Sequence, residues 1–190
     1  MTVRKATAAA SPRGMTPEHA LLGVLATTES GTGHGYDLAR SFAAGSPLGS
    51  VLHLEAGMIY HHVKKLEKLG WLRLISDGGR RPGRRTVAIT DEGRAELRRW
   101  LAEPVQHTRE VRLEFLVKLY LALRLDEATA NRLVSEQRAL LAGVRESLRD
   151  EPISTPATAP EFGALVRDLR AMQTEAADSW LGSVQDRLDD

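Results

Sequence analysis

The chain has 190 residues, 42% of them hydrophobic and 27% charged, which is enough apolar material for one large domain or two small ones. It contains no cysteine, so its own residues cannot form a disulfide, a thiolate nucleophile or an iron-sulfur site. No apolar stretch approaches the roughly 18 to 20 residues that a membrane span needs, and the chain start lacks the apolar segment of a secretory signal. The sequence therefore predicts a cytoplasmic protein without a membrane partner.

The formal net charge of +1 conceals two halves of opposite sign. Residues 1–103 contain 15 Lys and Arg against 10 Asp and Glu, whereas residues 104–190 contain 11 against 15. The stretch 61–99 alone carries 11 basic and 5 acidic side chains. Such a concentration favours binding to a polyanion, although it also suits a charged surface that only contacts water. The first half is the candidate polyanion binder.

Three short helices are expected near the start of the chain. Residues 1–14 show no apolar period and are expected to form a flexible tail. Thr16 and Pro17 read as the N-cap and first residue of a helix that continues through the apolar run to residue 25. A glycine-rich segment at 31–35 breaks the helical pattern, and a second helix is predicted over 36–44.

The third helix is predicted over residues 57–69. Ile59, Val63 and Leu66 have the spacing of one helical stripe, and Gly70 stands where a C-terminal cap glycine belongs. The side chains expected on the opposite face and its flanks are basic and aromatic. They are Tyr60, His61, Lys64, Lys65 and Lys68.

Two strand-like runs, 71–75 and 84–89, bracket a turn rich in glycine, proline and arginine. Thr90 is expected to cap a following helix that ends near Pro104. Three helices, a basic hairpin and a helix are the element order of a winged helix-turn-helix domain, here residues 15–103.

The second half, residues 104–190, reads as three amphipathic helices over 110–123, 127–149 and 162–188. Three prolines between 152 and 160 predict an extended spacer before the last helix. The predicted fold class is mainly α with a small β-hairpin: a winged helix-turn-helix domain plus a C-terminal helical dimerisation domain.

This element order favours double-stranded DNA, because a helix fills the major groove while the hairpin follows the backbone. RNA fits less well, since no exposed aromatic stacking platform is evident. His61 and Lys64 are expected to read bases, and Tyr60 to donate to a phosphate. The basic side chains expected to neutralise phosphates are Lys64, Lys65, Arg80, Arg81, Arg84 and Arg85. The alternative is a helical interaction module whose winged domain binds protein.

Four segments in this order resemble the PadR family of bacterial transcriptional regulators. They are 21–25 (LLGVL), 34–39 (HGYDLA), 57–72 (GMIYHHVKKLEKLGWL) and 90–94 (TDEGR). The run 111–120 and the two helices after it resemble the C-terminal domain of the virulence-activator-like subgroup. The resemblance covers roughly residues 15 to 188.

Two segments depart from the family pattern. Family members usually have Ser-Pro-Gly-Thr where this chain has residues 55–58 (EAGM), and often have Tyr-Tyr at Thr86 and Val87. Gly57, Tyr60 and the wing arginines still match. The resemblance implies a homodimer that binds an inverted-repeat operator, usually as a repressor. It also adds Tyr36, Gly57 and Met58 to the expected DNA-binding residues.

The last helix independently predicts dimerisation, because its apolar stripe is too long to be covered easily within a small monomer. The stripe consists of Phe162, Leu165, Leu169, Met172, Ala176, Trp180, Val184 and Leu188. Further dimer contacts are expected from Leu113, Leu116, Val117 and Tyr120. The alternative is packing on the two preceding helices of the same chain.

Some PadR-like proteins bind flat aromatic effectors near the dimer interface, which makes Trp100 and Trp180 candidates, although tryptophan more often serves packing. An enzyme is not expected. The chain lacks His-Glu-x-x-His, a phosphate-binding loop and a Gly-x-Ser-x-Gly elbow, so the sequence predicts no catalytic residue, no metal site and no cofactor.

Overall fold

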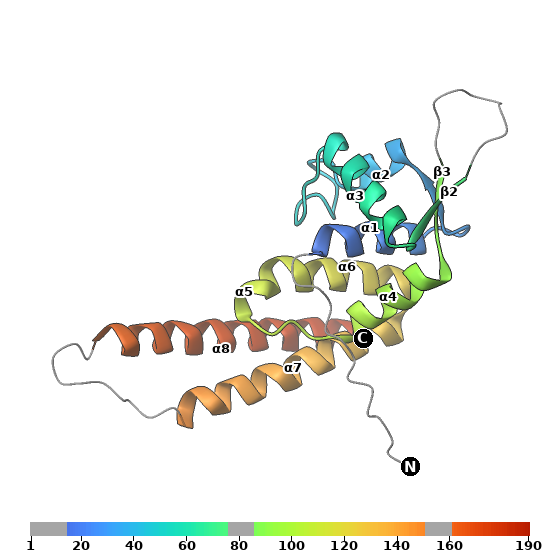
Figure 1. Cartoon of the computed structure of the whole chain (residues 1–190). Helices are drawn as coiled ribbons and strands as arrows, with labels where there is room; N and C mark the ends of the chain where they lie inside the picture. The colour runs from blue at the N-terminus through green and yellow to red at the C-terminus, as the bar shows by residue number, and fades with distance from the viewer. Residues whose placement is uncertain (1–14, 76–85, 151–160) are drawn as a thin grey trace, which may run out of the picture.

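A computed structural model describes residues 15–75, 86–150 and 161–190. The predicted tail at 1–14, the predicted spacer at 152–160 and the tip of the hairpin lie outside the described residues. Figure 1 shows a compact N-terminal unit above a layer of longer helices, with α7 and α8 side by side. Within the described ranges, no helix is both long and apolar enough to cross a membrane.

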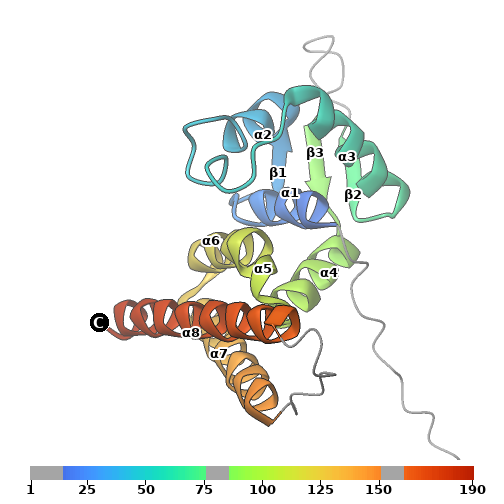
Figure 2. The ribbon, with the colours of Figure 1, turned by 90° about the vertical axis from the view of Figure 1, so that its left-hand side faces the viewer.

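The N-terminal unit combines helices with a three-stranded antiparallel sheet of order β1-β3-β2. Its elements are α1 (Thr16–Ala26), β1 (Thr32–His34), α2 (Gly35–Ser41), α3 (Ala56–Lys68), β2 (Leu72–Ile75), β3 (Thr86–Ile89) and α4 (Asp91–Ala102). Figure 2 shows the strands between α2 and α3, with α1 beneath them. This arrangement confirms the predicted mainly helical fold with a small hairpin.

The first strand, β1, is missing from the sequence prediction, which expected only a break in the helical pattern there. Gly33 pairs with Val87 in the centre of the β1–β3 ladder, and Gly31 turns the chain into it with φ of 65°. A strand of Thr-Gly-His has no apolar alternation, so only pairing with a distant strand reveals it.

The recognition-helix candidate α3 is anchored as its stripe predicts. Ile59 and Leu66 are buried in the first core, and Val63 packs against it. Gly70 follows the helix with φ of 74°, a left-handed conformation that favours glycine. Burying a leucine or isoleucine side chain contributes roughly 1.5–3 kcal/mol, so this seam fixes which face of α3 points outward.

The predicted helix caps are half right. The Thr90 hydroxyl accepts the backbone N–H of Gly93 at 3.0 Å, which confirms it as the N-cap of α4. Thr16 is not the cap of α1, because the helix begins one residue earlier than expected, with Met15 in the cap position. The Thr16 hydroxyl instead donates to Glu114 Oε2 at 3.2 Å, in the second half of the chain.

The second half is helical, and α7 and α8 run antiparallel around a second core (Figure 1). Its elements are α5 (Thr108–Glu110), the π-helical turn η1 (Val111–Phe115), α6 (Leu116–Leu125), α7 (Glu127–Asp150) and α8 (Glu161–Asp189). The single helix predicted over 110–123 is thus three segments. A π turn inserts an extra residue per turn, and such turns often occur at functional sites.

The two halves are packed together through α1 and α6. Val117 and Leu121 of α6 are fully buried within the first core. At Gly23 of α1, a Cβ atom would lie 2.3 Å from the Leu121 side chain, so the helices approach too closely for any larger residue without a shift. The winged unit and the helical unit therefore share a tight contact.

Candidate DNA-binding surface and effector pocket

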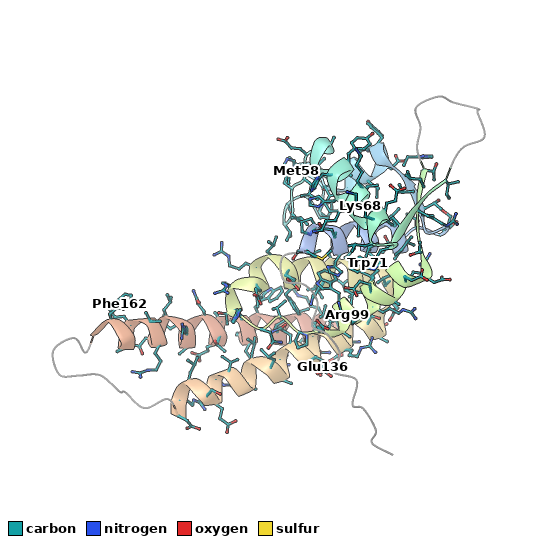
Figure 3. The ribbon with its side chains drawn as sticks, in the orientation of Figure 1. Met58, Lys68, Trp71, Arg99, Glu136 and Phe162 are labelled. Atoms are coloured by element: carbon teal, nitrogen blue, oxygen red, sulfur yellow. The ribbon has the colours of Figure 1, made fainter. Side chains whose placement is uncertain are left out.

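The outward face of α3 carries most of the predicted DNA-binding residues. Met58, Tyr60, His61 and Lys64 are all exposed, while the opposite face is held in the core. In Figure 3, Met58 and Lys68 mark the two ends of α3 on the side of the molecule away from α7 and α8. Gly57 is also exposed, in the first turn of the helix.

Tyr36 comes from the start of α2, which the fold places beside α3. Tyr36, Tyr60 and Lys64 together line a cavity of about 460 Å³ between α2, α3 and the sheet. Gly35, the first residue of α2, lies beside the Tyr60 ring, because a Cβ atom there would be 3.4 Å from the Tyr60 hydroxyl. The structure thus brings together residues that are 24 and more positions apart in the sequence.

Lys65 differs from its neighbours because its charge is already paired. Its Nζ lies 2.6 Å from Glu18 Oε1, and His62 Nδ1 lies 3.0 Å from the same oxygen. Glu18 belongs to α1 and is 1% exposed. In the sequence Glu18 is only an acid in the first turn of a helix, because no local pattern indicates that α1 lies against α3.

Arg80, Arg81, Arg84 and Arg85 lie outside the described residues, so their contact with DNA phosphates stays a prediction. Strands β2 and β3, which are joined by this segment, are paired from Leu72 with Ile89 to Ile75 with Thr86.

The apolar stripe of α8 is largely uncovered in the protomer. Figure 3 shows Phe162 at the outer end of α8, far from Arg99 near the centre of the molecule. The exposed members of the stripe are Phe162, Leu165, Leu169, Met172, Ala176 and Trp180. Val184 and Leu188 pack against the second core instead.

The remaining dimer candidates are divided. Leu113 is exposed, whereas Leu116 and Tyr120 are half-buried. Val117 is fully buried in the core of its own protomer, so the prediction that it contacts a partner is corrected. These four residues were chosen by their helical spacing, and spacing does not say whether an apolar face packs within the protomer or against a partner.

The two tryptophans proposed as effector contacts have opposite environments. Trp100 is 2% exposed and is enclosed by protein, so a ligand cannot stack on it without unfolding the junction. Trp180 is 37% exposed and contacts Phe115 edge-on, with ring centroids 6.1 Å apart. The prediction is therefore corrected for Trp100 and remains for Trp180.

Trp180 lines a cavity of about 390 Å³ between α8 and the segment that contains the π turn. The other lining residues are Thr108, Arg109, Val111, Arg112, Leu116, Gln173, Ala176 and Ala177. An indole and apolar walls suit a flat ring, and two guanidinium groups suit a carboxylate. No group of three or more His, Asp or Glu side chains within 15–75, 86–150 and 161–190 is placed to hold a metal ion.

Comparisons with known proteins agree with this geometry. Residues 21–99 match the family model described as the transcriptional regulator PadR-like family. A probable transcriptional regulator of Mycobacterium tuberculosis is 38% identical over 78 residues, which are 40% of this chain and 39% of that relative. The negative transcriptional regulator PadR of Bacillus subtilis is 28% identical over 185 residues, covering 90% of this chain and 97% of the relative.

Solved structures of Bacillus subtilis PadR also align along most of the chain. The complex with operator DNA is 24% identical, with a TM-score of 0.43, and covers 89% of this chain and 97% of that one. The complex with p-coumaric acid is 26% identical, with a TM-score of 0.40, and covers 95% and 99%. Residues 21–99 therefore match a PadR-like domain, and the chain as a whole is similar to a PadR regulator over most of its length.

Proposed function

We propose that this protein is a sequence-specific DNA-binding repressor that acts as a homodimer on an inverted-repeat operator. The observation that carries the proposal is the outward face of α3, where Tyr60, His61 and Lys64 are exposed beside Tyr36. These residues lie within the part of the chain that matches the PadR-like model. A relative, the PadR protein of Bacillus subtilis, is a negative regulator and has been solved with operator DNA.

In this proposal, residues 15–103 bind DNA and residues 104–190 form the dimer. His61 and Lys64 read base edges in the major groove, while the wing arginines contact phosphates. The uncovered stripe of α8 supplies the dimer contacts, because an exposed apolar patch of this length is costly in water. Two-fold symmetry then places the two copies of α3 roughly 34 Å, or a multiple of it, apart. Repression follows from occupying promoter DNA in the cytoplasm.

The cavity beside Trp180 is the proposed effector site. Its indole, its apolar walls and its two arginines favour a small aromatic carboxylic acid. p-Coumaric acid, with which Bacillus subtilis PadR has been solved, belongs to that chemical class. The cavity adjoins the exposed stripe at Ala176 and Trp180, so a bound ligand would alter the surface that forms the dimer.

The test is fluorescence anisotropy of the full chain on a labelled duplex from upstream of its own gene and on a scrambled duplex, each at two salt concentrations. A preference of order 10³ or more with a steep salt slope supports the proposal. Lys64→Ala should reduce that preference, whereas Arg80→Ala should weaken binding to both duplexes about equally. Absence of binding to either duplex at low salt would contradict it and favour a winged domain that binds protein.

A further inference from the structure

Glu18 is a buried acid that faces the recognition helix from the neighbouring helix. It lies in the first turn of α1, and its Oε1 accepts from Lys65 Nζ at 2.6 Å. His62 Nδ1 lies 3.0 Å from the same oxygen. Both partners belong to α3, so one carboxylate of α1 engages two side chains of the helix that presents the DNA-binding face.

The carboxylate is held in its charged form. Burial alone would raise the pKa of Glu18, but the hydrogen bonds from Lys65 and His62 outweigh burial and lower it overall. Its second oxygen, Oε2, is buried and has no hydrogen-bond partner among the described residues. An ionised Glu18 is therefore compensated first by Lys65 and then by His62, and the Lys65 ammonium points towards the buried carboxylate.

Lys64 and Lys68 provide the contrast on the same helix. Both are exposed, and neither forms an ion pair with a carboxylate within the described ranges. The side chain of Lys65 is 44% exposed, so it lies at the same surface as the other two lysines. Its charge, however, is paired with the buried carboxylate of Glu18. One of the three lysines on the outer side of α3 is thus withdrawn from the positive field that faces DNA.

A lysine that neutralises a DNA phosphate releases counterions, which steepens the salt dependence by about 0.9 per contact and strengthens binding to any sequence alike. Contacts of this kind add affinity without adding discrimination. We propose that Glu18 limits the affinity for DNA of any sequence: as an internal counter-ion it withholds Lys65 from DNA phosphates and keeps non-specific binding weak. This inference rests on the proposed DNA-binding function.

A purely structural role for the pair makes the opposite prediction. If Glu18 only fastens α1 to α3, replacing it loosens the helix and weakens binding to every duplex. If Glu18 acts as a counter-ion, replacing it frees a cation at the DNA surface and tightens binding to random DNA.

The experiment measures the affinity for operator and random duplexes and its salt slope for the whole chain and four variants. Glu18→Gln keeps the side-chain shape and removes the charge, so the slope should steepen by about 0.9 and the affinity for the random duplex should rise, with the operator-to-random ratio unchanged. The double variant Glu18→Gln with Lys65→Met should return to the wild-type slope. Lys68→Met is the matched control, because Lys68 is exposed on the same helix and forms no ion pair within the described ranges, and its slope should flatten by about 0.9.

An unchanged or flatter salt slope for Glu18→Gln overturns the inference. A slope for the double variant that is flatter than the wild-type slope also overturns it, because Lys65 would then already contact a phosphate in the wild-type protein. If Glu18→Gln shows no cooperative thermal unfolding, it is not folded, and the single variant Lys65→Met then tests the inference. Its slope should equal that of wild type, and a loss of about 0.9 overturns the inference. Wild-type protein that binds no DNA would overturn the proposed function as well, whereas normal wild-type binding with an unchanged Glu18→Gln slope overturns only this inference.

Discussion

The imidazole of His19 lies flat on the indole of Trp100, with ring centroids 4.8 Å apart and planes 7° from parallel. His19 Nε2 lies 2.8 Å from Glu96 Oε1, and the Trp100 indole N–H donates to Glu114 Oε1 at 3.0 Å. Lys118 Nζ stands 4.8 Å from the centroid of the same indole. This stack joins α1, α4, η1 and α6, so Trp100 holds the DNA-binding unit against the helical unit.

Replacing Trp100 with phenylalanine should lower the free energy of unfolding by about 1–3 kcal/mol, because the hydrogen bond to Glu114 is lost and a small cavity remains. Urea denaturation followed by far-UV circular dichroism measures the change. Trp180→Phe is the control, since Trp180 is partly exposed and should cost clearly less. Equal losses for the two variants would refute the assignment of Trp100 to the junction.

Leu169→Glu should convert the dimer to a monomer, because it places a charge in the middle of the exposed α8 stripe. Sedimentation velocity measures the mass of the variant. Its affinity for the operator should fall when the dimer is lost. Leu123→Glu is a matched control, since Leu123 of α6 is 53% exposed against 56% for Leu169 and lies outside the stripe. A Leu169→Glu protein that sediments as a dimer would exclude this face as the main interface.

p-Coumaric acid should quench the tryptophan fluorescence of the wild-type protein and weaken operator binding, if the cavity beside Trp180 is the effector site. Trp180→Phe should remove most of the quenching, because the other two tryptophans do not line this cavity. Arg112→Met should weaken ligand binding about 10-fold or more through loss of a charge-assisted hydrogen bond. Quenching without any change in operator affinity would rule out an effector role for the cavity.

Acid should destabilise the junction through Glu96. Burial alone would raise the pKa of Glu96, but hydrogen bonds from Arg99 and His19 outweigh it and lower the pKa overall. The folded protein thus binds this proton less readily than the unfolded chain. The resulting stability is present above the ordinary glutamate pKa of about 4.3 and is lost as the pH falls through the lowered value.

Glu96→Gln should therefore be less stable than wild type at pH 6, and the difference should shrink towards pH 3. Urea denaturation at pH 6, 4 and 3 measures it. Glu136→Gln, at an exposed position in the middle of α7, is the control and should track wild type. A constant difference between Glu96→Gln and wild type at all three pH values would show that the charge of Glu96 does not contribute.

Local sequence patterns were sufficient to predict most of the helices and the buried face of α3. The 3- and 4-residue spacing of Ile59, Val63 and Leu66 predicted which face of α3 is buried, and Gly70 and Thr90 predicted where neighbouring elements end and begin. Each of these signals depends on residues within one or two helical turns, so a single sequence contains all of the relevant information.

The errors have one physical origin, namely contact between segments far apart in the chain. Strand β1 exists because Gly33 pairs with Val87, and Val117 is buried because α6 fits against α1 at Gly23. Apolar spacing marks Val117 as buried without saying whether the neighbour is the same chain or another one. The π turn at 111–115 likewise has no sequence signal of its own.

Short motifs and apolar periodicity were enough to predict a PadR-like resemblance, the mainly helical class and the basic and aromatic outer face of α3, because both are local properties of the chain. The packing of the helices is needed to see which lysine of α3 is paired with a carboxylate and which tryptophan lines a cavity. Lys65 is neutralised by Glu18, 47 positions away, and Trp100 is enclosed by α1, α4 and η1. Burial and ion pairing depend on how helices pack, and packing brings together residues that no local pattern connects.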